Sequence, residues 1–342
     1  MADHRLELFR QGVPETGTIR QVAARAEASG WDGLALTDSQ NLIGDPFIAM
    51  ALGAQVTERL RFMTAVTNPA TRHPAVLATT VATVQEESGG RAVPGIGRGD
   101  TALFHLGRSP MPVADFFPAV EEVHTYLNGG EVDQRGRPSR LRWLDRATQP
   151  PVPVDIAASG PKVIAFAART VERITFALGA DPERVAWGID LARSAMREAG
   201  RADDEVSFGA YVSVGCHPDP AVGAELIRGG LAAFAHFSAM PGSTGAGLGE
   251  HDRDLVAEVG RRYDSNLHLV NAADHSTVLD DEFVSRFGII GDPETCVGRL
   301  RELADLGLER FVVIGATFGA DPQEARRSAA LTRDEVLPGL RG

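Results

Sequence analysis

An alternation of apolar strand patterns with helix patterns, repeated eight times along the 342 residues, constrains the fold more than any other feature of the sequence. Short apolar runs end in turns rich in Gly, Pro and Asn, and apolar residues at helical spacing follow most of these turns. This order is typical of parallel strands joined by helices. We expect strands at residues 6–9, 33–37, 61–66, 91–97, 153–159, 173–179, 206–215 and 310–316.

The helix patterns fall between these strands. Apolar residues share one face between Thr16 and Ser29, and Gly30 stands where a helix would end. Pro94 has no backbone N–H to donate and is unfavourable inside the fourth expected strand. We expect helices at residues 16–29, 47–57, 75–87, 113–127, 161–169, 182–199 and 293–306.

Eight strands with intervening helices predict an α/β fold, the (β/α)8 barrel, whose usual core of about 250 residues tolerates insertions. We expect one domain over residues 1–342, with insertion loops at about 131–151 and 229–290. The glycine-rich segment 239–252 is expected to be a mobile lid or loop. An open doubly wound sheet would use the same alternation, but the chain has no G-x-G-x-x-G after its first strand.

Composition and charge exclude several classes of partner. A net charge of −12 argues against nucleic acid and anionic membranes, because both require a positive field. There is no apolar run of about 18 residues and no signal-peptide pattern, so we expect a cytoplasmic protein. Cys216 and Cys296 are far apart and lack a CxxC or His-rich neighbour, which predicts buried, idle thiols with neither a disulfide scaffold nor a metal site.

The loops that follow the expected strands are unusually polar or glycine-rich. In an α/β barrel the loops at the carboxyl ends of the strands carry the functional residues. GIGRGD alone also fits a tight turn after a buried strand, because Gly supplies positive φ. The loops are TDSQN (37–41), VTNPATRHP (66–74), GIGRGD (95–100), ASGPK (158–162) and LGADPE (178–183).

Taken together, the motifs form an ordered set: Thr37–Gln40, Val66–Pro69, Thr71–Pro74, Ser88–Arg91, Gly95–Asp100, His105–Arg108, Ala158–Lys162 and Gly179–Pro182. This set resembles the bacterial luciferase-like flavin and deazaflavin oxidoreductases over nearly the whole chain. The likeness is greatest to the methylenetetrahydromethanopterin-reductase-like branch, which uses coenzyme F420. It implies a luciferase-like barrel, usually homodimeric, that transfers hydride between F420 and a small-molecule substrate.

The resemblance also implies where the parts of the cofactor bind. The segment Thr64–Asn68 would pass beneath the ring, with a non-prolyl cis peptide at Ala65–Val66; the competing interpretation is an ordinary buried strand end. The expected cofactor-binding residues are Asp38, Ala65, Val66, Thr67, Asn68, Gly97, Arg98, Ser159, Gly160, Lys162, Gly179 and Ala180.

An anionic group of the cofactor needs donors. Ser159-Gly160 and Gly179-Ala180 each precede an expected helix, so free N–H groups at two helix N-termini are predicted to bind phosphate. Ser159 and Asp181 would otherwise be simple N-caps. Candidates for the acidic tail or an anionic substrate are Arg72, His73, Arg98, Arg108 and Lys162.

Hydride transfer needs no protein nucleophile and at most one proton donor. The candidates for that catalytic role are Asp38, which could also hydrogen-bond the ring edge, Glu7 and His105, which could instead cap a loop. In the sugar-phosphate dehydrogenase branch, His and Trp follow the aspartate. Ser39 and Ile43 stand at those places here, which argues against glucose-6-phosphate chemistry.

Two alternatives remain within the same fold. One is an FMN-dependent monooxygenase that needs a separate flavin reductase. The other is a non-catalytic, flavin-free barrel that acts by binding or dimerisation. The apolar helices 47–57 and 75–87 are the expected homodimer contact.

Overall fold

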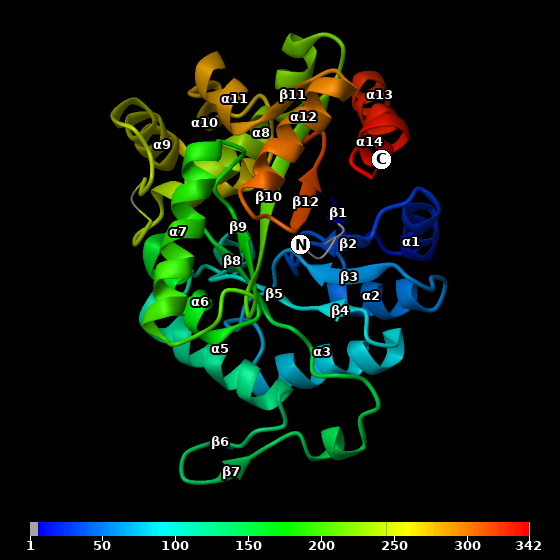
Figure 1. The fold of residues 1–342 in the computed structure, drawn as a ribbon, viewed down its shortest axis with the longest axis vertical. Helices are drawn as coiled ribbons and strands as arrows, with labels where there is room; N and C mark the ends of the chain where they lie inside the picture. Colours follow the sequence, from blue (N-terminus) through cyan, green and yellow to red (C-terminus); the bar gives the residue numbers. More distant parts are fainter. Residues whose placement is uncertain (1–5, 244, 342) are drawn as a thin grey trace. The chain divides into compact units, whose positions relative to one another are not determined.

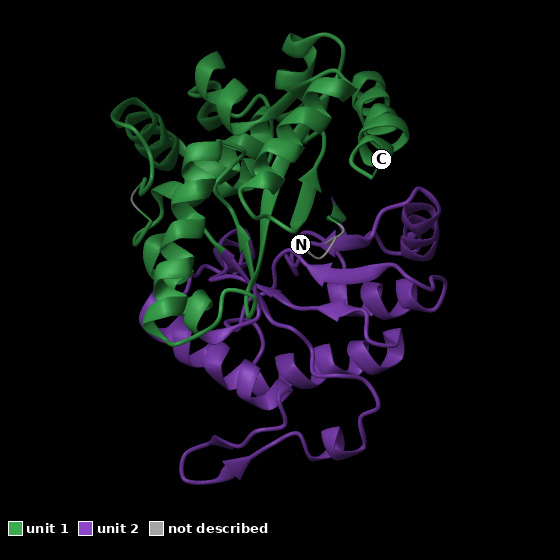
Figure 2. Ribbon diagram, viewed as in Figure 1, with its two compact units in different colours: residues 1–10, 158–169, 174–342 green, residues 11–157, 170–173 purple. Residues whose placement is uncertain are grey.

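The structure is a computed structural model that describes residues 6–243 and 245–341 (Figure 1). Its contacts divide the chain into two compact units, shown in Figure 2. Unit 1 comprises residues 1–10, 158–169 and 174–342, and unit 2 comprises residues 11–157 and 170–173. The single-domain organisation stays a prediction.

Unit 2 contains parallel strands in the order β4-β3-β2, and separately the pair β5-β8. The fourth expected strand, 91–97, is wrong as one element, because it is broken at Pro94 into β4 and β5. Pro94 has no N–H for the ladder, although its carbonyl accepts a bond from the Asp155 N–H at 3.0 Å. The strands are β2 (Gly33–Leu36), β3 (Arg61–Thr64), β4 (Ala92–Val93), β5 (Gly95–Ile96) and β8 (Asp155–Ala158, of which Ala158 belongs to unit 1).

Local signals explain where the helices of unit 2 begin and end. Asp45 caps α2 by accepting the N–H groups of Phe47 and Ile48, and Pro46 occupies the first turn. The α3 helix ends at Gly89, whose φ of +67° favours glycine. The helices are α1 (Ile19–Ala28), α2 (Pro46–Ala54), α3 (Pro74–Ser88), α4 (Thr101–Phe104) and α5 (Val113–Leu127).

The expected insertion at 131–151 is not simply a loop. It holds a short antiparallel hairpin, β6 (Val132–Asp133) and β7 (Pro138–Ser139), followed by a 3-10 helix, η1 (Arg142–Arg146). Asp133 accepts a bond from the Gly136 N–H at 2.6 Å and so stabilises the hairpin turn. Within unit 2 the hairpin projects away from α3 and α5 (Figure 1).

Unit 1 contains parallel strands in the order β1-β12-β10-β9. Glu7 of β1 is in register with Arg310 of β12, which in turn is in register with Gly209 of β10. A further strand, β11, pairs with the end of β10; three residues are too short for a period-2 pattern, so the sequence did not indicate it. The strands are β1 (Glu7–Gly12, Glu7–Arg10 in this unit), β9 (Arg173–Phe176, Ile174–Phe176 in this unit), β10 (Ser207–Cys216), β11 (Ile289–Gly291) and β12 (Arg310–Ile314).

The 229–290 segment is mostly helical, so the expectation of an insertion loop there is wrong. It begins inside α8, a helix of 20 residues that is capped by Asp219 and packs along β10. Gly223 and Gly215 allow this close approach, because a Cβ on Gly215 would lie 2.1 Å from the Gly223 carbonyl oxygen. No described helix is both long and apolar enough to cross a membrane. The helices of unit 1 are α6 (Pro161–Thr170, through Arg169), α7 (Pro182–Glu198), α8 (Pro220–Ala239), α9 (Glu250–Arg262), η2 (Ser265–Leu267), α10 (Asp274–Thr277), α11 (Asp281–Phe287), α12 (Pro293–Asp305), α13 (Pro322–Leu331), η3 (Thr332–Val336) and α14 (Leu337–Gly339).

Candidate functional site

In unit 2, the carboxylate of Asp38 lies just beyond the end of β2 and is almost fully buried. Its Oδ2 accepts hydrogen bonds from the Thr67 hydroxyl at 2.7 Å and from Arg72 Nη1 at 2.6 Å. Arg72 Nη2 donates to Asp45 at 2.7 Å. We call these four residues, Asp38, Asp45, Thr67 and Arg72, the Asp38 cluster. Oδ1 of Asp38 receives no hydrogen bond from the described residues.

The charges of the cluster bear on what Asp38 can do. Burial opposes the charge on Arg72, but Asp38 and Asp45 outweigh it and raise the pKa of the guanidinium. Asp38 Oδ2 accepts from both Thr67 and Arg72, so the structure uses this carboxyl group as a hydrogen-bond acceptor. Asp38 thus fits the ring-edge role better than the proton-donor role.

The end of β3 reaches the surface only at Ala65 and Val66, which are half-buried between fully buried neighbours. The Ala65–Val66 peptide bond is cis, as the resemblance implied. A Cβ on Gly97 would lie 2.7 Å from Val66 Cγ2, so a larger residue at this position would displace the Val66 side chain. The Gly97 N–H donates to the Thr67 carbonyl at 2.9 Å. Backbone and small side chains thus come together at the end of β3.

Three other predicted residues of unit 2 lie on the adjoining loops. Asn68 is buried, and its Oδ1 accepts the N–H groups of Ala70 and Thr71, which shapes the turn. Arg98 donates to the Met111 carbonyl at 2.7 Å, and burial lowers its pKa. His105 ends α4, and its Nε2 is buried with no partner among the described residues. His105 therefore retains a nitrogen that can hold a proton.

Unit 1 contains the predicted anion-binding segment at the start of α6. The Ser159 hydroxyl donates to the Phe237 carbonyl and lies 3.3 Å from the Ser243 hydroxyl. No described residue accepts the N–H groups of Lys162 and Val163, and the Lys162 side chain is exposed. Two hydroxyls and two backbone donors are thus collected at one helix N-terminus.

The second predicted anion-binding segment, Gly179-Ala180, is not free. The Ala180 N–H donates to the Phe287 carbonyl at 2.9 Å, and both residues of the segment are buried. Asp181 caps α7 by accepting the Arg184 N–H at 2.9 Å. The capping interpretation is therefore confirmed here, because α11 packs where a phosphate was expected.

Two other expectations also need correction. Glu7 is the first residue of β1 and is in register with Arg310, the first residue of β12, so it lies at the amino ends of these strands rather than the carboxyl ends. Among the candidates for the acidic tail, Arg72 is engaged by two carboxylates. His73 Nδ1 caps α3, and Arg108 donates to the Ala70 carbonyl at 3.0 Å.

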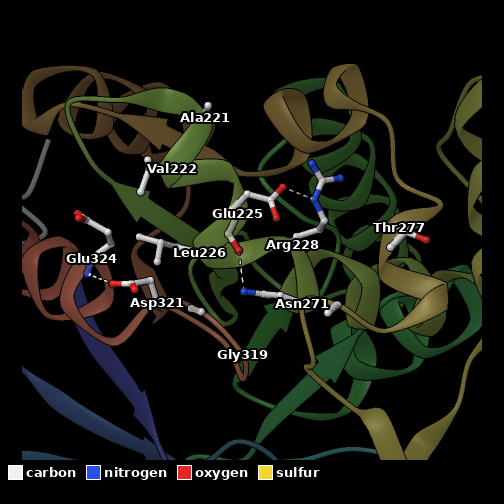
Figure 3. A pocket seen from close by; sticks show the side chains of 12 residues that line it. Ala221, Val222, Glu225, Leu226, Arg228, Asn271, Thr277, Gly319, Asp321 and Glu324 are labelled. Atoms are coloured by element: carbon white, nitrogen blue, oxygen red, sulfur yellow. Dashed lines mark hydrogen bonds and ion pairs between the residues drawn. The ribbon is translucent and has the colours of Figure 1, made fainter.

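A cavity of about 790 Å³ lies in unit 1 between α8, α13 and the loop after β12 (Figure 3). Its polar groups are largely used by the protein itself. Arg228 donates to Glu225 and to the Leu279 carbonyl, and Asn271 donates to the Glu225 carbonyl while accepting the Gly229 N–H. The cavity offers few open donors, so we assign no ligand to it.

Sequence reasoning missed Ser243 and Arg184. Ser243 lies in a glycine-rich segment that carries no motif, and nothing local indicates that it meets Ser159. Arg184 follows the DPE turn and resembles an exposed first-turn arginine, yet it is 2% exposed. No acidic residue stands four positions before or after Arg184, so the local sequence offered no ion-pair partner for a buried arginine.

Comparison with known proteins places these observations in a family. The luciferase-like monooxygenase family profile matches residues 5–310. The 5,10-methylenetetrahydromethanopterin reductase of Methanopyrus kandleri is 27% identical over 314 residues, covering 84% of this chain and 85% of the reductase. An F420-dependent glucose-6-phosphate dehydrogenase of Microbacterium testaceum is 29% identical over 335 residues, covering 92% and 91%.

Solved structures agree on the fold. The coenzyme F420-dependent tetrahydromethanopterin reductase from Methanopyrus kandleri matches with a TM-score of 0.73 at 22% identity, over 98% of this chain and 99% of that one. A long-chain alkane monooxygenase matches with a TM-score of 0.65 at 14% identity, over 98% and 91%. The predicted barrel and the resemblance drawn from the motifs are thereby confirmed. The chain belongs to the luciferase-like monooxygenase family and has its TIM-barrel fold.

Proposed function

We propose that this protein is an oxidoreductase that uses coenzyme F420 to transfer hydride to or from a small organic substrate. The F420-dependent relatives support this cofactor. Two observations in unit 2 carry the proposal: Asp38 binds Thr67 and Arg72 through Oδ2 alone, and Ala65, Val66 and Gly97 bring backbone and small side chains together at the end of β3. A flat ring with a hydrogen-bonding edge is the ligand that such a surface fits.

The bound deazaflavin would supply the hydride chemistry at its C5, while the protein supplies orientation, exclusion of water and a proton. Asp38 Oδ1 would accept an N–H of the ring edge, and the Thr67 and Arg72 bonds to Oδ2 hold the carboxylate in place. Ala65 and Val66 would support one ring face. His105 Nε2 would be the candidate proton donor.

In unit 1, the start of α6 would bind the phosphodiester. The N–H groups of Lys162 and Val163 would donate to it, and the helix dipole favours its negative charge. Lys162 is exposed and carries no ion pair among the described residues, so its charge remains available to the acidic tail. Gly179 and Ala180 are left out of this proposal because their segment packs against Phe287.

Titration of the purified protein with F420 and with FMN, followed by absorbance, tests the cofactor. We expect F420 to saturate at the lower concentration. Ala65→Leu should weaken F420 binding by about tenfold or more, because it fills the ring surface. Ala51→Leu, on the half-buried face of α2, is the matched control and should bind normally.

The alternative is an FMN-dependent monooxygenase, which the family profile and the solved monooxygenases favour. It would need a separate flavin reductase. Tighter binding of FMN than of F420 in the same titration would replace our proposal with this one. Binding of neither cofactor would favour the non-catalytic barrel.

We further propose a homodimer formed through α2 and α3. Their exposed faces include Ile48 and Val76, which are 64% and 52% exposed. Sedimentation equilibrium at micromolar concentration should give about twice the 36.4 kDa chain mass. Ile48→Glu should yield monomers, whereas Leu267→Glu, at an exposed position of unit 1, should not. A wild-type protein that sediments only as a monomer would contradict the dimer.

A further inference from the structure

Residues 240–243, which follow α8, cover the start of α6 in unit 1. We refer to the described residues between α8 and α9, 240–243 and 245–249, as the 240–249 loop. A Cβ on Gly160 would lie 2.7 Å from Ser243 Oγ and 2.9 Å from the Gly242 carbonyl oxygen. The loop therefore sits directly on Gly160, and it is the loop that brings the Ser243 hydroxyl to Ser159.

A buried arginine holds the first end of this loop. Arg184 of α7 is 2% exposed and donates to the Ser238 hydroxyl at 2.8 Å and to the Leu178 carbonyl at 3.1 Å. The Ser238 carbonyl in turn accepts the Gly245 N–H at 2.9 Å, which closes the first half of the loop. Ser238 thus supplies both the hydroxyl that Arg184 binds and the carbonyl that accepts the Gly245 N–H.

Charged side chains hold the second end of the loop. Asp252, in the first turn of α9, is buried and pairs with Arg286 at 3.0 Å. Arg286 also pairs with Asp181, the cap of α7, at 3.0 Å. Burial lowers the pKa of Arg184 to about 10, while Asp181 and Asp252 favour its charged form. Arg184 therefore holds the first end of the loop and Arg286 the second, and Asp181 and Asp252 act electrostatically on Arg184.

We propose that Arg184 is a positioning residue for anion binding: it fixes the 240–249 loop over α6, so that Ser243 completes the donors for the phosphodiester of the cofactor. This inference rests on the proposed function, since it assigns how the same site binds its anion. Arg184 itself does not touch the ligand. Loss of its bond to Ser238 frees the loop and removes one hydroxyl from the site.

Hydrogen–deuterium exchange on the unliganded protein tests the positioning directly. Arg184→Met should speed exchange in the 240–249 loop about tenfold, the change expected when one charge-assisted hydrogen bond is lost. Ser238→Ala removes only the hydroxyl and should act in the same direction, which covers the case in which Arg184→Met does not fold. Arg184→Lys should restore part of the protection. Unchanged exchange in the folded variants would overturn the inference, whatever the cofactor.

Arg310→Met is the matched control. Arg310 is also a fully buried arginine of unit 1, but it donates to Ser207, to Thr175 and to the Ile174 carbonyl, at the strands rather than at the loop. We expect it to lower stability without changing loop exchange. Equal loop exchange in the two arginine variants would mean general loosening and would also overturn the inference.

Affinities then connect the loop to the cofactor. F420 and a truncated deazaflavin that ends at the ribityl chain are titrated into each variant. Arg184→Met should weaken F420 binding by about tenfold and leave the truncated compound unaffected, since only the former carries a phosphodiester. An equal loss for both compounds would contradict the anion role. Failure of the wild type to bind F420 would refute the proposed function, while the exchange experiment would still decide the role of Arg184.

Discussion

The Asp38 cluster of unit 2 and the 240–249 loop of unit 1 hold their candidate ligand-binding groups by different means. Asp38 and Thr67 follow neighbouring strands, and backbone ladders fix both: the Ala65 N–H donates to Leu36 at 2.7 Å, and Gly97 donates to Thr67 at 2.9 Å. Ser243 lies in a loop without a ladder, where its N–H donates to the Met240 carbonyl at 2.9 Å and side-chain bonds hold the ends of the loop. Crowding of the backbone should therefore cost more stability at the strand ends than at the loop, because the loop can move away.

Adding a methyl group to a glycine beside the strand ends should have the largest effect. A Cβ on Gly95 would lie 2.1 Å from the Thr64 carbonyl oxygen, which belongs to the ladder and has no room to move. We expect Gly95→Ala to lower the free energy of unfolding by about 3 kcal/mol, measured by urea denaturation. Gly12→Ala, which meets nothing within 4 Å, is the control. Equal stabilities would show that these strand ends can shift.

Breaking the Asp38 cluster should have the next largest effect. Asp38→Asn leaves Arg72 without its buried partner, and we expect a loss of about 2 kcal/mol together with weaker F420 binding. Asp45→Asn is the control, because Asp45 is 37% exposed and Asn can still cap α2. Thermal unfolding and F420 titration of both variants measure the difference. Similar losses in the two would mean that Arg72 matters as a surface charge only.

The equivalent glycine substitution in unit 1 should cost less stability. In Gly160→Ala the Cβ meets the 240–249 loop, and the loop can move away, so we expect a loss of only about 1 kcal/mol. Affinity for F420 should fall more than stability, because Ser243 moves with the loop. A loss as large as that of Gly95→Ala would show that the loop is as rigid as a strand end.

The smallest expected effect is a pH dependence near α10. His275 is 1% exposed, and its Nδ1 accepts the Asp264 N–H at 3.4 Å, which requires a neutral ring. Burial and the nearby His236 lower the pKa of His275, although Asp264 and Asp274 oppose the shift. Below about pH 6.5 His275 therefore binds a proton in the unfolded chain, whereas the folded chain keeps it neutral to a lower pH. Stability should be full above that pH and decline as the pH falls toward the lowered pKa.

Urea denaturation of the wild type and of His275→Gln between pH 7.5 and about pH 5.5 measures this pH dependence of the free energy of unfolding. Its slope with pH cannot exceed the value for one proton. The difference between the two proteins should shrink as the pH falls. A constant difference over this range would show that His275 does not titrate differently in the folded state.

The strand ends of unit 2 were largely predictable from the sequence. The turn TDSQN after β2 and the glycine at 97 were named from local motifs, and the cis bond at Ala65–Val66 was implied by the family resemblance. The partner of Asp38 was not, because Arg72 was taken for a ligand of the acidic tail. Its two carboxylates lie 34 and 27 residues away, and only packing brings them together.

The anion site of unit 1 was predicted in part. Ser159-Gly160 precedes α6 as expected. Gly179-Ala180 is covered by Phe287, and Glu7 lies at the amino end of β1 rather than at its carboxyl end. The sequence distinguishes a helix start from a loop, yet it does not show what packs against that start. The 229–290 segment shows the same limit, since it was assigned as an insertion loop from the spare length between the seventh and eighth expected strands, and its helices were not predicted.

By itself, the sequence determined the alternation of strands and helices, the family and the polar strand ends, because periodicity, capping and turn chemistry act within a few residues. Only the tertiary structure decided the pairing of Arg72 with Asp38, the burial of Arg184 and the contact of Ser243 with Ser159. Cys216 and Cys296 are 80 residues apart in the sequence, yet the fold brings both to Gly291. Cys216 pairs with Gly291 in the strand register, and the Cys296 thiol approaches the Gly291 carbonyl at 3.5 Å. Such contacts join distant segments, and their geometry follows from how helices pack on strands rather than from any local pattern.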